Sequence, residues 1–226
     1  VASLNYILTS PGWRQEHNGF SHQNPGFIDT IVQKHGCFAH VYFPPDKNTT
    51  IATLARCLAS KNEINLIVAG KSMEPQWLTP EEADAELVRG LMIWKFASEE
   101  NPDIVISSAG DYLTKEALAA IMLIKADAPE IKVRYVNILE LSALGIGNEA
   151  CRVPLHDFHH YFTENKPVIF NFHGYPETLK QALFDHQDGT ARFFVHGYLE
   201  SGTTTTPFDM HVRNQTSRYH LVIEAY

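Results

Sequence analysis

The stretch that decides the fold spans residues 104–138 and reads IVISSAGDYLTKEALAAIMLIKADAPEIKVRYVNI. Its two ends, Ile104–Ser107 and Val133–Ile138, are short runs rich in β-branched residues, which favours strands. Between them, Thr114–Ala126 has the length and pattern of a helix. A strand, a helix and a second strand in this order predict an α/β architecture with a largely parallel sheet.

The same alternation runs through the rest of the chain. We predict further strands at Leu4–Thr9, Phe38–Phe43, Ile64–Val68, Val168–Phe172 and Phe193–Tyr198. We predict further helices at Phe27–His35, Thr50–Ser60, Thr79–Arg89 and Pro176–Phe184. The third of these helices has the clearest start, with Thr79 as N-cap, Pro80 in the first turn and Glu82 three residues after the cap.

The polar, proline-containing stretch Ser98–Asp103 separates two α/β parts. Because domain boundaries fall in segments of this kind, we predict a domain boundary there. Residues 1–98 would then be the end of one domain, and residues 99–226 a second domain of ordinary size. The first part begins abruptly and both ends of the sequence look cut, so we expect a fragment of a longer protein.

Composition excludes several classes of protein. Of the 226 residues, 44% are hydrophobic and 19% are charged, which fits a folded chain and argues against disorder. The net charge of −8 argues against a partner that is nucleic acid or an acidic membrane. No apolar stretch approaches a membrane span, and the three cysteines form neither a CxxC pair nor a disulfide framework. We therefore predict a cytoplasmic protein with reduced thiols.

The densest polar cluster is the stretch WRQEHNGFSHQNPG at residues 13–26, between a predicted strand and a predicted helix. Ligands of α/β sheets usually bind in this position, at the carboxyl end of a strand. The cluster gathers phosphate binders, hydroxyl binders and proton-transfer groups, namely Arg14, Gln15, His17, Asn18, His22 and Gln23. The alternative is that these side chains only satisfy one another.

Three further groups are weaker candidates. Lys71 follows the strand at 64–68 and suits a phosphate, although a plain surface lysine is the commoner explanation. The threonine run at 203–206 is better explained as a cap of the following segment than as an anion site. A zinc hydrolase is an alternative function, with histidines that share a helix face, but we prefer a surface cluster because the HExxH order is missing. These histidines are His156, His159 and His160.

Taken together, these strings resemble the phosphoketolase family over nearly the whole chain. The resemblance is carried by TSPGWRQEHNGFSHQNPGF at residues 9–27, YFPPD at 42–46, RYVN at 134–137, KPVIFNFHGY at 166–175 and TTTTPFDM at 203–210. The chain departs from the family at Glu16, where Asp is common, and at Pro154-Leu-His156, where many members have Pro-His-Gly. The second departure leaves His156 without an inferred role.

The resemblance implies the end of a pyrimidine-binding α/β domain followed by a transketolase-like C-terminal α/β domain with a mostly parallel sheet. It implies an aldehyde-lyase that cleaves xylulose 5-phosphate or fructose 6-phosphate with inorganic phosphate, giving acetyl phosphate and an aldose phosphate. Thiamine diphosphate and Mg²⁺ would bind to the full-length enzyme, a homodimer, and we expect this fragment alone to bind neither and to be inactive. The alternative is a non-catalytic dimerisation or regulatory module of the same enzyme.

The resemblance also implies roles for single residues. His22, Gln15 and His17 would be catalytic, and the substrate-binding residues would be Asn18, Lys71 and Arg14. The chemistry agrees, because expelling hydroxide after cleavage of the sugar requires an acid. A histidine such as His22 serves that purpose near neutral pH.

Overall fold

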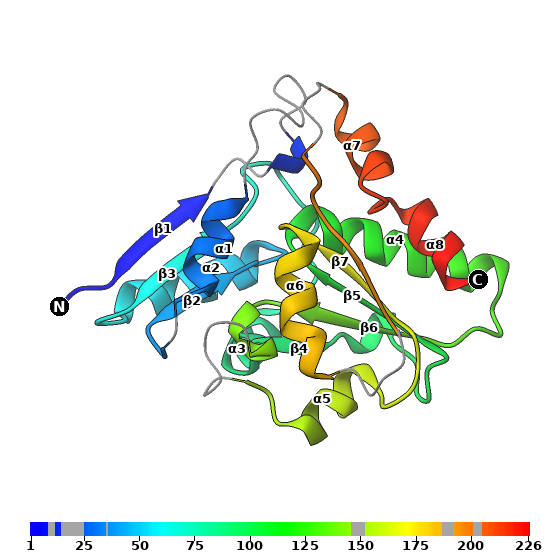
Figure 1. Cartoon of the computed structure of the whole chain (residues 1–226), viewed down its shortest axis with the longest axis horizontal. Coiled ribbons are helices and arrows are strands. Elements are labelled where there is room, and N and C mark those ends of the chain that lie inside the picture. The colour runs from blue at the N-terminus through cyan, green and yellow to red at the C-terminus, as the bar shows by residue number, and fades with distance from the viewer. Residues whose placement is uncertain (9–11, 15–24, 35, 146–151, 187–191, 201–204) are drawn as a thin grey trace.

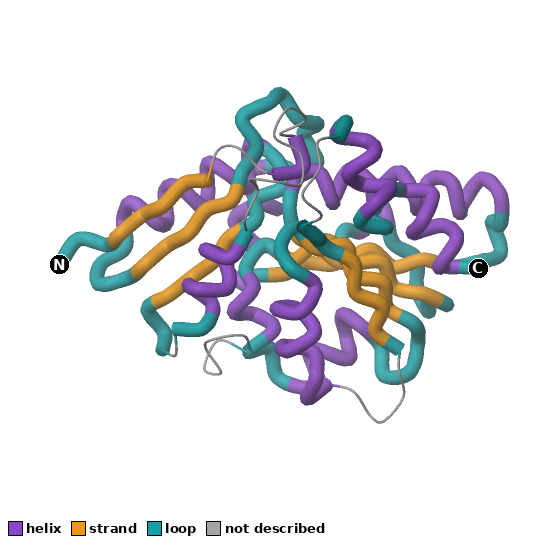
Figure 2. Tube along the Cα trace, turned by 45° about the horizontal axis from the view of Figure 1, so that its top comes forward, coloured by secondary structure: helices purple, strands orange, loops and turns teal. Residues whose placement is uncertain are grey.

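The computed structural model describes residues 1–8, 12–14, 25–34, 36–145, 152–186, 192–200 and 205–226. Within these residues the strands form two sheets, which Figure 2 shows as two separate groups. The first sheet lies toward the N-terminus and the second toward the C-terminus, and the two chain ends lie at opposite sides of the molecule (Figure 1).

The first sheet has the order β1-β3-β2 and is parallel throughout. Its strands are β1 (Leu4–Leu8), β2 (Ala39–Tyr42) and β3 (Ile64–Val68). The helices of this part are α1 (Gly26–Val32) and α2 (Lys47–Ala59). Strand β3 is almost entirely buried, whereas most of β1, at one edge of the sheet, is exposed.

The second sheet has the order β4-β6-β5-β7-β8 and is parallel except for β4. Its strands are β4 (Leu91–Ile93), β5 (Ile104–Ala109), β6 (Val133–Ile138), β7 (Val168–Phe172) and β8 (Phe193–His196). Its helices are α3 (Pro80–Arg89), α4 (Asp111–Asp127), α5 (Leu155–Phe162), α6 (Pro176–Leu183), α7 (Pro207–Arg213) and α8 (Arg218–Ala225). Helix α8 packs against α4 (Figure 1).

The deciding stretch folds as its pattern predicts. Strands β5 and β6 pair in parallel, with Ile104 opposite Val133, and α4 connects them. All six residues of β5 are buried, which is typical of a strand covered on both faces. The predicted α/β class with a mostly parallel sheet is therefore confirmed.

One hydrophobic cluster crosses from the first sheet to the second. Val41 and Leu66 of the first sheet belong to the same cluster as Val136 and Phe172 of the second. Phe43, which directly follows β2, packs edge-on against Phe172 with ring centroids 5.7 Å apart. Because the core is shared, the two sheets meet through packed side chains.

Side-chain caps set several helix starts. Thr79 accepts the backbone N–H of Glu82, and the Glu82 carboxylate accepts that of Thr79, as predicted for a capping box. Thr206 accepts the N–H of Asp209 and caps α7, which confirms the capping interpretation for this threonine. Helix α2 starts earlier than predicted because Asp46 caps it.

The described structure contains elements that the sequence patterns did not predict, namely β4, α5, α7 and α8. Strand β4 precedes the predicted domain boundary and pairs with β6 of the second sheet. Ser98 Oγ also accepts the backbone N–H of Tyr135 at 2.9 Å. The boundary after residue 98 stays a prediction. In the described part of the chain, no helix is long and apolar enough to span a membrane.

Candidate functional site at the meeting edge of the two sheets

The carboxyl ends of strands from both sheets meet at one edge. Phe43, just after β2, donates its backbone N–H to Leu139, just after β6, at 2.7 Å. Gly70, just after β3, donates its backbone N–H to the carboxylate of Asp111, just after β5, at 2.6 Å. Since ligands of α/β proteins bind outside the carboxyl ends of strands, this edge is the place to look for a site.

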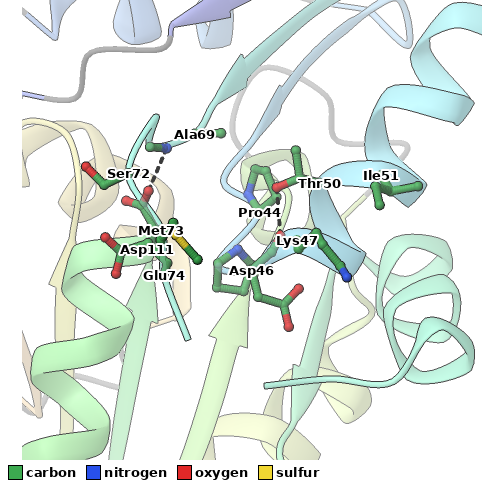
Figure 3. A pocket seen from close by; sticks show the side chains of 12 residues that line it. Pro44, Asp46, Lys47, Thr50, Ile51, Ala69, Ser72, Met73, Glu74 and Asp111 are labelled. Carbon is green, nitrogen blue, oxygen red and sulfur yellow. Dashed lines mark hydrogen bonds between the residues drawn. The ribbon is translucent and has the colours of Figure 1, made fainter. Parts of the chain in front are cut away.

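A pocket of about 360 Å³ opens at this edge (Figure 3). One wall comes from the end of β2 and the start of α2, and the other from the segment after β3 and the start of α4. The lining residues are Pro44, Pro45, Asp46, Lys47, Thr50, Ile51, Ala69, Gly70, Ser72, Met73, Glu74 and Asp111. Both polar and apolar groups therefore face the cavity.

The carboxylate of Asp46 holds this pocket together. One oxygen accepts the backbone N–H of Thr49 at 2.9 Å and so caps α2. The other accepts the Gln76 side-chain amide and the backbone N–H groups of Trp77 and Leu78, at 2.6 to 2.9 Å. Asp46 is 3% exposed, and through these four N–H donors it joins the start of α2 to the segment that leads into α3.

Asp111 has a comparable function on the opposite wall. Its carboxylate accepts the N–H of Gly70 and, at 2.8 Å, that of Tyr112. Burial raises the pKa of Asp111 to about 6, and the two N–H donors oppose this rise. The carboxylate is therefore ionised near neutral pH, where it is the stronger acceptor.

Lys71, a predicted phosphate contact, lies directly after Gly70 at the end of β3 and is exposed. Glu74, three residues further, forms an ion pair with Lys115 of α4. The structure thus places Lys71 in a segment that contacts the first turns of α4.

Arg14, the other described candidate, belongs to a short 3₁₀ helix at Gly12–Arg14. Its guanidinium lies over the ring of Tyr112, 5.6 Å from the centroid. A second pocket, of about 210 Å³, opens here and is lined by Arg14, Tyr112, Lys115, Glu116, Pro207, Phe208, His211 and Arg218. Arg218 forms a double hydrogen bond with the Glu116 carboxylate in this pocket.

Trp13 fixes the position of this 3₁₀ helix. Its indole N–H donates to the backbone carbonyl of His173, at the end of β7, and its ring stacks on His211 at 4.7 Å. Burial lowers the pKa of His173 to about 3 and that of His211 to about 4, so both imidazoles are neutral at physiological pH. Gly110 leaves room for His173, because a Cβ there would lie 3.0 Å from the His173 Cβ.

The structure places two predicted residues on segments that contact the start of α4. Arg14 contacts Tyr112, while the residue before Lys71 is bound by Asp111, so both cations belong to segments anchored on the start of α4. The other candidates, Gln15, His17, Asn18 and His22, lie outside the described residues, and their roles stay predictions.

The histidines considered for zinc lie on α5 and interact with nearby carboxylates instead. His156 Nδ1 is 3.2 Å from Asp157, and His159 Nδ1 is 3.9 Å from Glu164. Among the described residues, no group of three or more His, Cys, Asp or Glu side chains could hold a metal ion.

The sequence patterns missed Asp111 and Tyr112. A signal was present, because Gly110 and Asp111 directly follow a buried strand, the same position that drew attention to Lys71. That signal does not predict that Asp111 binds Gly70, which follows a strand of the other sheet.

Solved transketolases share this fold. The transketolase from Leishmania mexicana matches with a TM-score of 0.68 at 15% identity, over 97% of this chain and 29% of that one. A protein described as split gene transketolase, inactive beta4 tetramer, matches with a TM-score of 0.62 at 16% identity, over 99% of this chain and 64% of that one. At these identities the likeness defines the fold, which is transketolase-like.

Sequence comparison is more specific. Residues 1–60 match the family D-xylulose 5-phosphate/D-fructose 6-phosphate phosphoketolase, and residues 71–226 match its C-terminal domain. The chain is 46% identical to a probable phosphoketolase of Brucella abortus (strain 2308) over 236 residues, and 47% identical to probable phosphoketolase 1 of Rhizobium meliloti (strain 1021) over 226. The chain belongs to the phosphoketolase family. It spans 29% and 28% of these two relatives, and 100% and 98% of its own length is matched.

Proposed function

We propose that this chain is part of a thiamine diphosphate-dependent phosphoketolase. The enzyme cleaves xylulose 5-phosphate, fructose 6-phosphate or both with inorganic phosphate, and releases acetyl phosphate, an aldose phosphate and water. The observation that carries the proposal is family membership along both parts of the chain. The meeting edge of the two sheets, with Lys71 and Arg14 on segments anchored to α4, supports a site for phosphorylated ligands there.

The cofactor supplies an electron sink for breaking the bond between C2 and C3 of the sugar. The described residues include cations suited to a phosphate, but no group suited to Mg²⁺. We assign the metal and the diphosphate of the cofactor to the remainder of the enzyme, since this chain spans less than a third of its relatives. We also propose that the full-length enzyme is a homodimer.

Within this site Lys71 pairs with the phosphate of the sugar, a group that does not react. Arg14 offers a second charge above the ring of Tyr112, in the first turn of α4. Gln15, His17 and Asn18 contact the reacting part of the substrate, and His22 donates a proton to the departing hydroxide. These roles rest on the match of the residues to the family motif.

The test uses the full-length enzyme that carries this chain, with thiamine diphosphate, Mg²⁺, xylulose 5-phosphate and inorganic phosphate. Hydroxylamine trapping should detect acetyl phosphate, and its formation should stop when phosphate or cofactor is left out. Acetyl phosphate that does not depend on added phosphate, or its complete absence, would refute the proposal.

A further inference from the structure

Helix α4 holds the segment that carries Lys71 on both sides of that residue. Before Lys71, the backbone N–H of Gly70 donates to Asp111 at 2.6 Å. After it, Glu74 forms an ion pair with Lys115. Asp111 and Lys115 are four residues apart and so lie on one face of α4. The backbone of Lys71 is therefore fixed between two anchors on the same helix.

The contact between Asp111 and Gly70 is a close one. Asp111 is 5% exposed, and both of its oxygens accept backbone N–H groups, one from Gly70 and one from Tyr112. A Cβ at residue 70 would overlap the Asp111 carboxylate and come within 3.0 Å of the Tyr112 hydroxyl. Glycine at residue 70 is thus explained by this close approach to the start of α4.

The two residues come from different sheets. Gly70 follows β3 of the first sheet, and Asp111, the first residue of α4, follows β5 of the second. A charge-assisted hydrogen bond of this kind, made in a buried place, is among the stronger polar contacts in proteins. Asp111 consequently fixes the loop that begins at Gly70 relative to the second sheet.

We propose that Asp111 is a positioning residue for the substrate phosphate, acting through Lys71 from across the boundary between the two sheets. The inference rests on the proposed function, because it needs Lys71 to be the phosphate contact. A lysine ammonium is a point charge on a flexible stem, so its backbone must be held for the charge to be in place. Without the hydrogen bond from Gly70 to Asp111, Lys71 can sample other positions. Binding of the sugar phosphate must then order Lys71, which costs binding free energy.

The first experiment measures steady-state kinetics of the full-length enzyme with Asp111→Asn and Asp111→Ala. Asparagine keeps an acceptor oxygen for one of the two N–H groups, but without the negative charge. We expect Asp111→Ala to raise KM for the sugar phosphate by about 10-fold, which corresponds to about 1.4 kcal/mol and is close to the contribution of one hydrogen bond to a charged group. Asp111→Asn should restore part of the loss, and kcat should change little in both.

A double-mutant cycle separates positioning from general structural damage. If Asp111 acts through Lys71, adding Asp111→Asn to Lys71→Ala should raise KM no further. Additive effects, or a loss confined to kcat, would overturn the inference. Asp127→Asn is the matched control, since Asp127 is the exposed last residue of α4. Lys115→Met removes the second anchor and should raise KM in the same direction, which keeps the test available if Asp111 variants do not fold.

Hydrogen exchange supplies a readout that needs no activity. Peptides covering residues 69–78 should exchange faster in Asp111→Asn than in the wild type, while peptides of α6 should not change. Unchanged exchange at 69–78 would overturn the inference whatever the kinetics show. Failure of the proposed function has a different signature, namely a wild-type enzyme that forms no acetyl phosphate.

Discussion

The indole N–H of Trp13 donates to the backbone carbonyl of His173 at 3.0 Å, across 160 residues of chain. This bond joins the segment after β1 of the first sheet to the end of β7 of the second. Trp13 is fully buried and also packs against Tyr198 and His211. The segment that leads into the predicted catalytic residues is therefore anchored on the second sheet.

Two substitutions of Trp13 should destabilise the protein by different amounts. Trp13→Phe removes the N–H but keeps most of the ring, and should cost about 1 kcal/mol. Trp13→Ala also leaves a cavity and should cost about 3–5 kcal/mol. Denaturant unfolding of the full-length enzyme measures both. Phe184→Ala is the control because Phe184 is 74% exposed. Equal losses for Trp13→Ala and the control would contradict the anchoring role.

Asp46→Ala should destabilise the pocket wall more than the loss of an ordinary cap. A cap alone contributes about 0.5–2 kcal/mol, and Asp46 also holds Gln76, Trp77 and Leu78. We expect a loss of about 2–4 kcal/mol because three further donors lose their acceptor, of which the N–H of Leu78 is buried. Denaturant unfolding measures the loss, with Asp84→Ala on the exposed face of α3 as control. A loss no greater than that of the control would show that the four bonds do not stabilise the fold.

The buried carboxyl of Glu86 should make the free energy of unfolding depend on pH. It is fully buried, one carboxyl oxygen accepts the side-chain N–H of Asn137 at 2.7 Å, and burial raises its pKa to about 8. The folded state therefore holds this proton more tightly than the unfolded state, whose carboxyl has the ordinary value of 4.5. Between these two values the free energy of unfolding should fall as pH rises.

The Glu86→Gln variant isolates that effect, because glutamine has nearly the same shape and does not titrate. The difference in unfolding free energy between wild type and Glu86→Gln should move in favour of the variant from pH 5 to pH 8. Urea unfolding at several pH values measures it. A difference that stays constant over this range would mean that Glu86 titrates normally in the folded protein.

Substitutions of Lys71 and of His22 should change different kinetic constants of the full-length enzyme. Lys71→Ala should raise KM for the sugar phosphate and leave kcat nearly unchanged, because the phosphate does not react. His22→Ala should lower kcat by about 10²-fold or more, the usual scale of general acid–base catalysis. Steady-state kinetics decide, with Lys180→Ala, an exposed lysine of α6, as control. A His22→Ala enzyme with normal kcat would end its catalytic assignment.

Sequence patterns predicted the strands and longer helices because each carries its own signal. The run at 104–107 is β-branched and bounded by Pro and Gly, and Thr79 with Glu82 has the spacing of a capping box. Strand β4 has three residues and pairs with a strand more than forty residues later, so its sequence has no period to detect.

The site was predictable only in part, for a similar reason. Lys71 follows a strand and could be found from the sequence alone. The hydrogen bond from the neighbouring Gly70 to Asp111 could not, because these two residues follow strands of different sheets and meet only when β3 and β5 direct their carboxyl ends toward one another. The Asp46 contacts to residues 76–78 are hidden in the same way, since the spacing of some thirty residues follows no local rule.

The central claim is that this chain belongs to an enzyme that transfers an acetyl group to inorganic phosphate. Phosphorus-31 NMR of the full-length enzyme with xylulose 5-phosphate and phosphate tests it most directly. We expect acetyl phosphate to appear in an amount equal to the inorganic phosphate consumed, and the 226-residue chain alone to produce none. Consumption of the sugar only when an aldose acceptor is added, with the phosphate signal unchanged, would identify a transketolase and contradict the account.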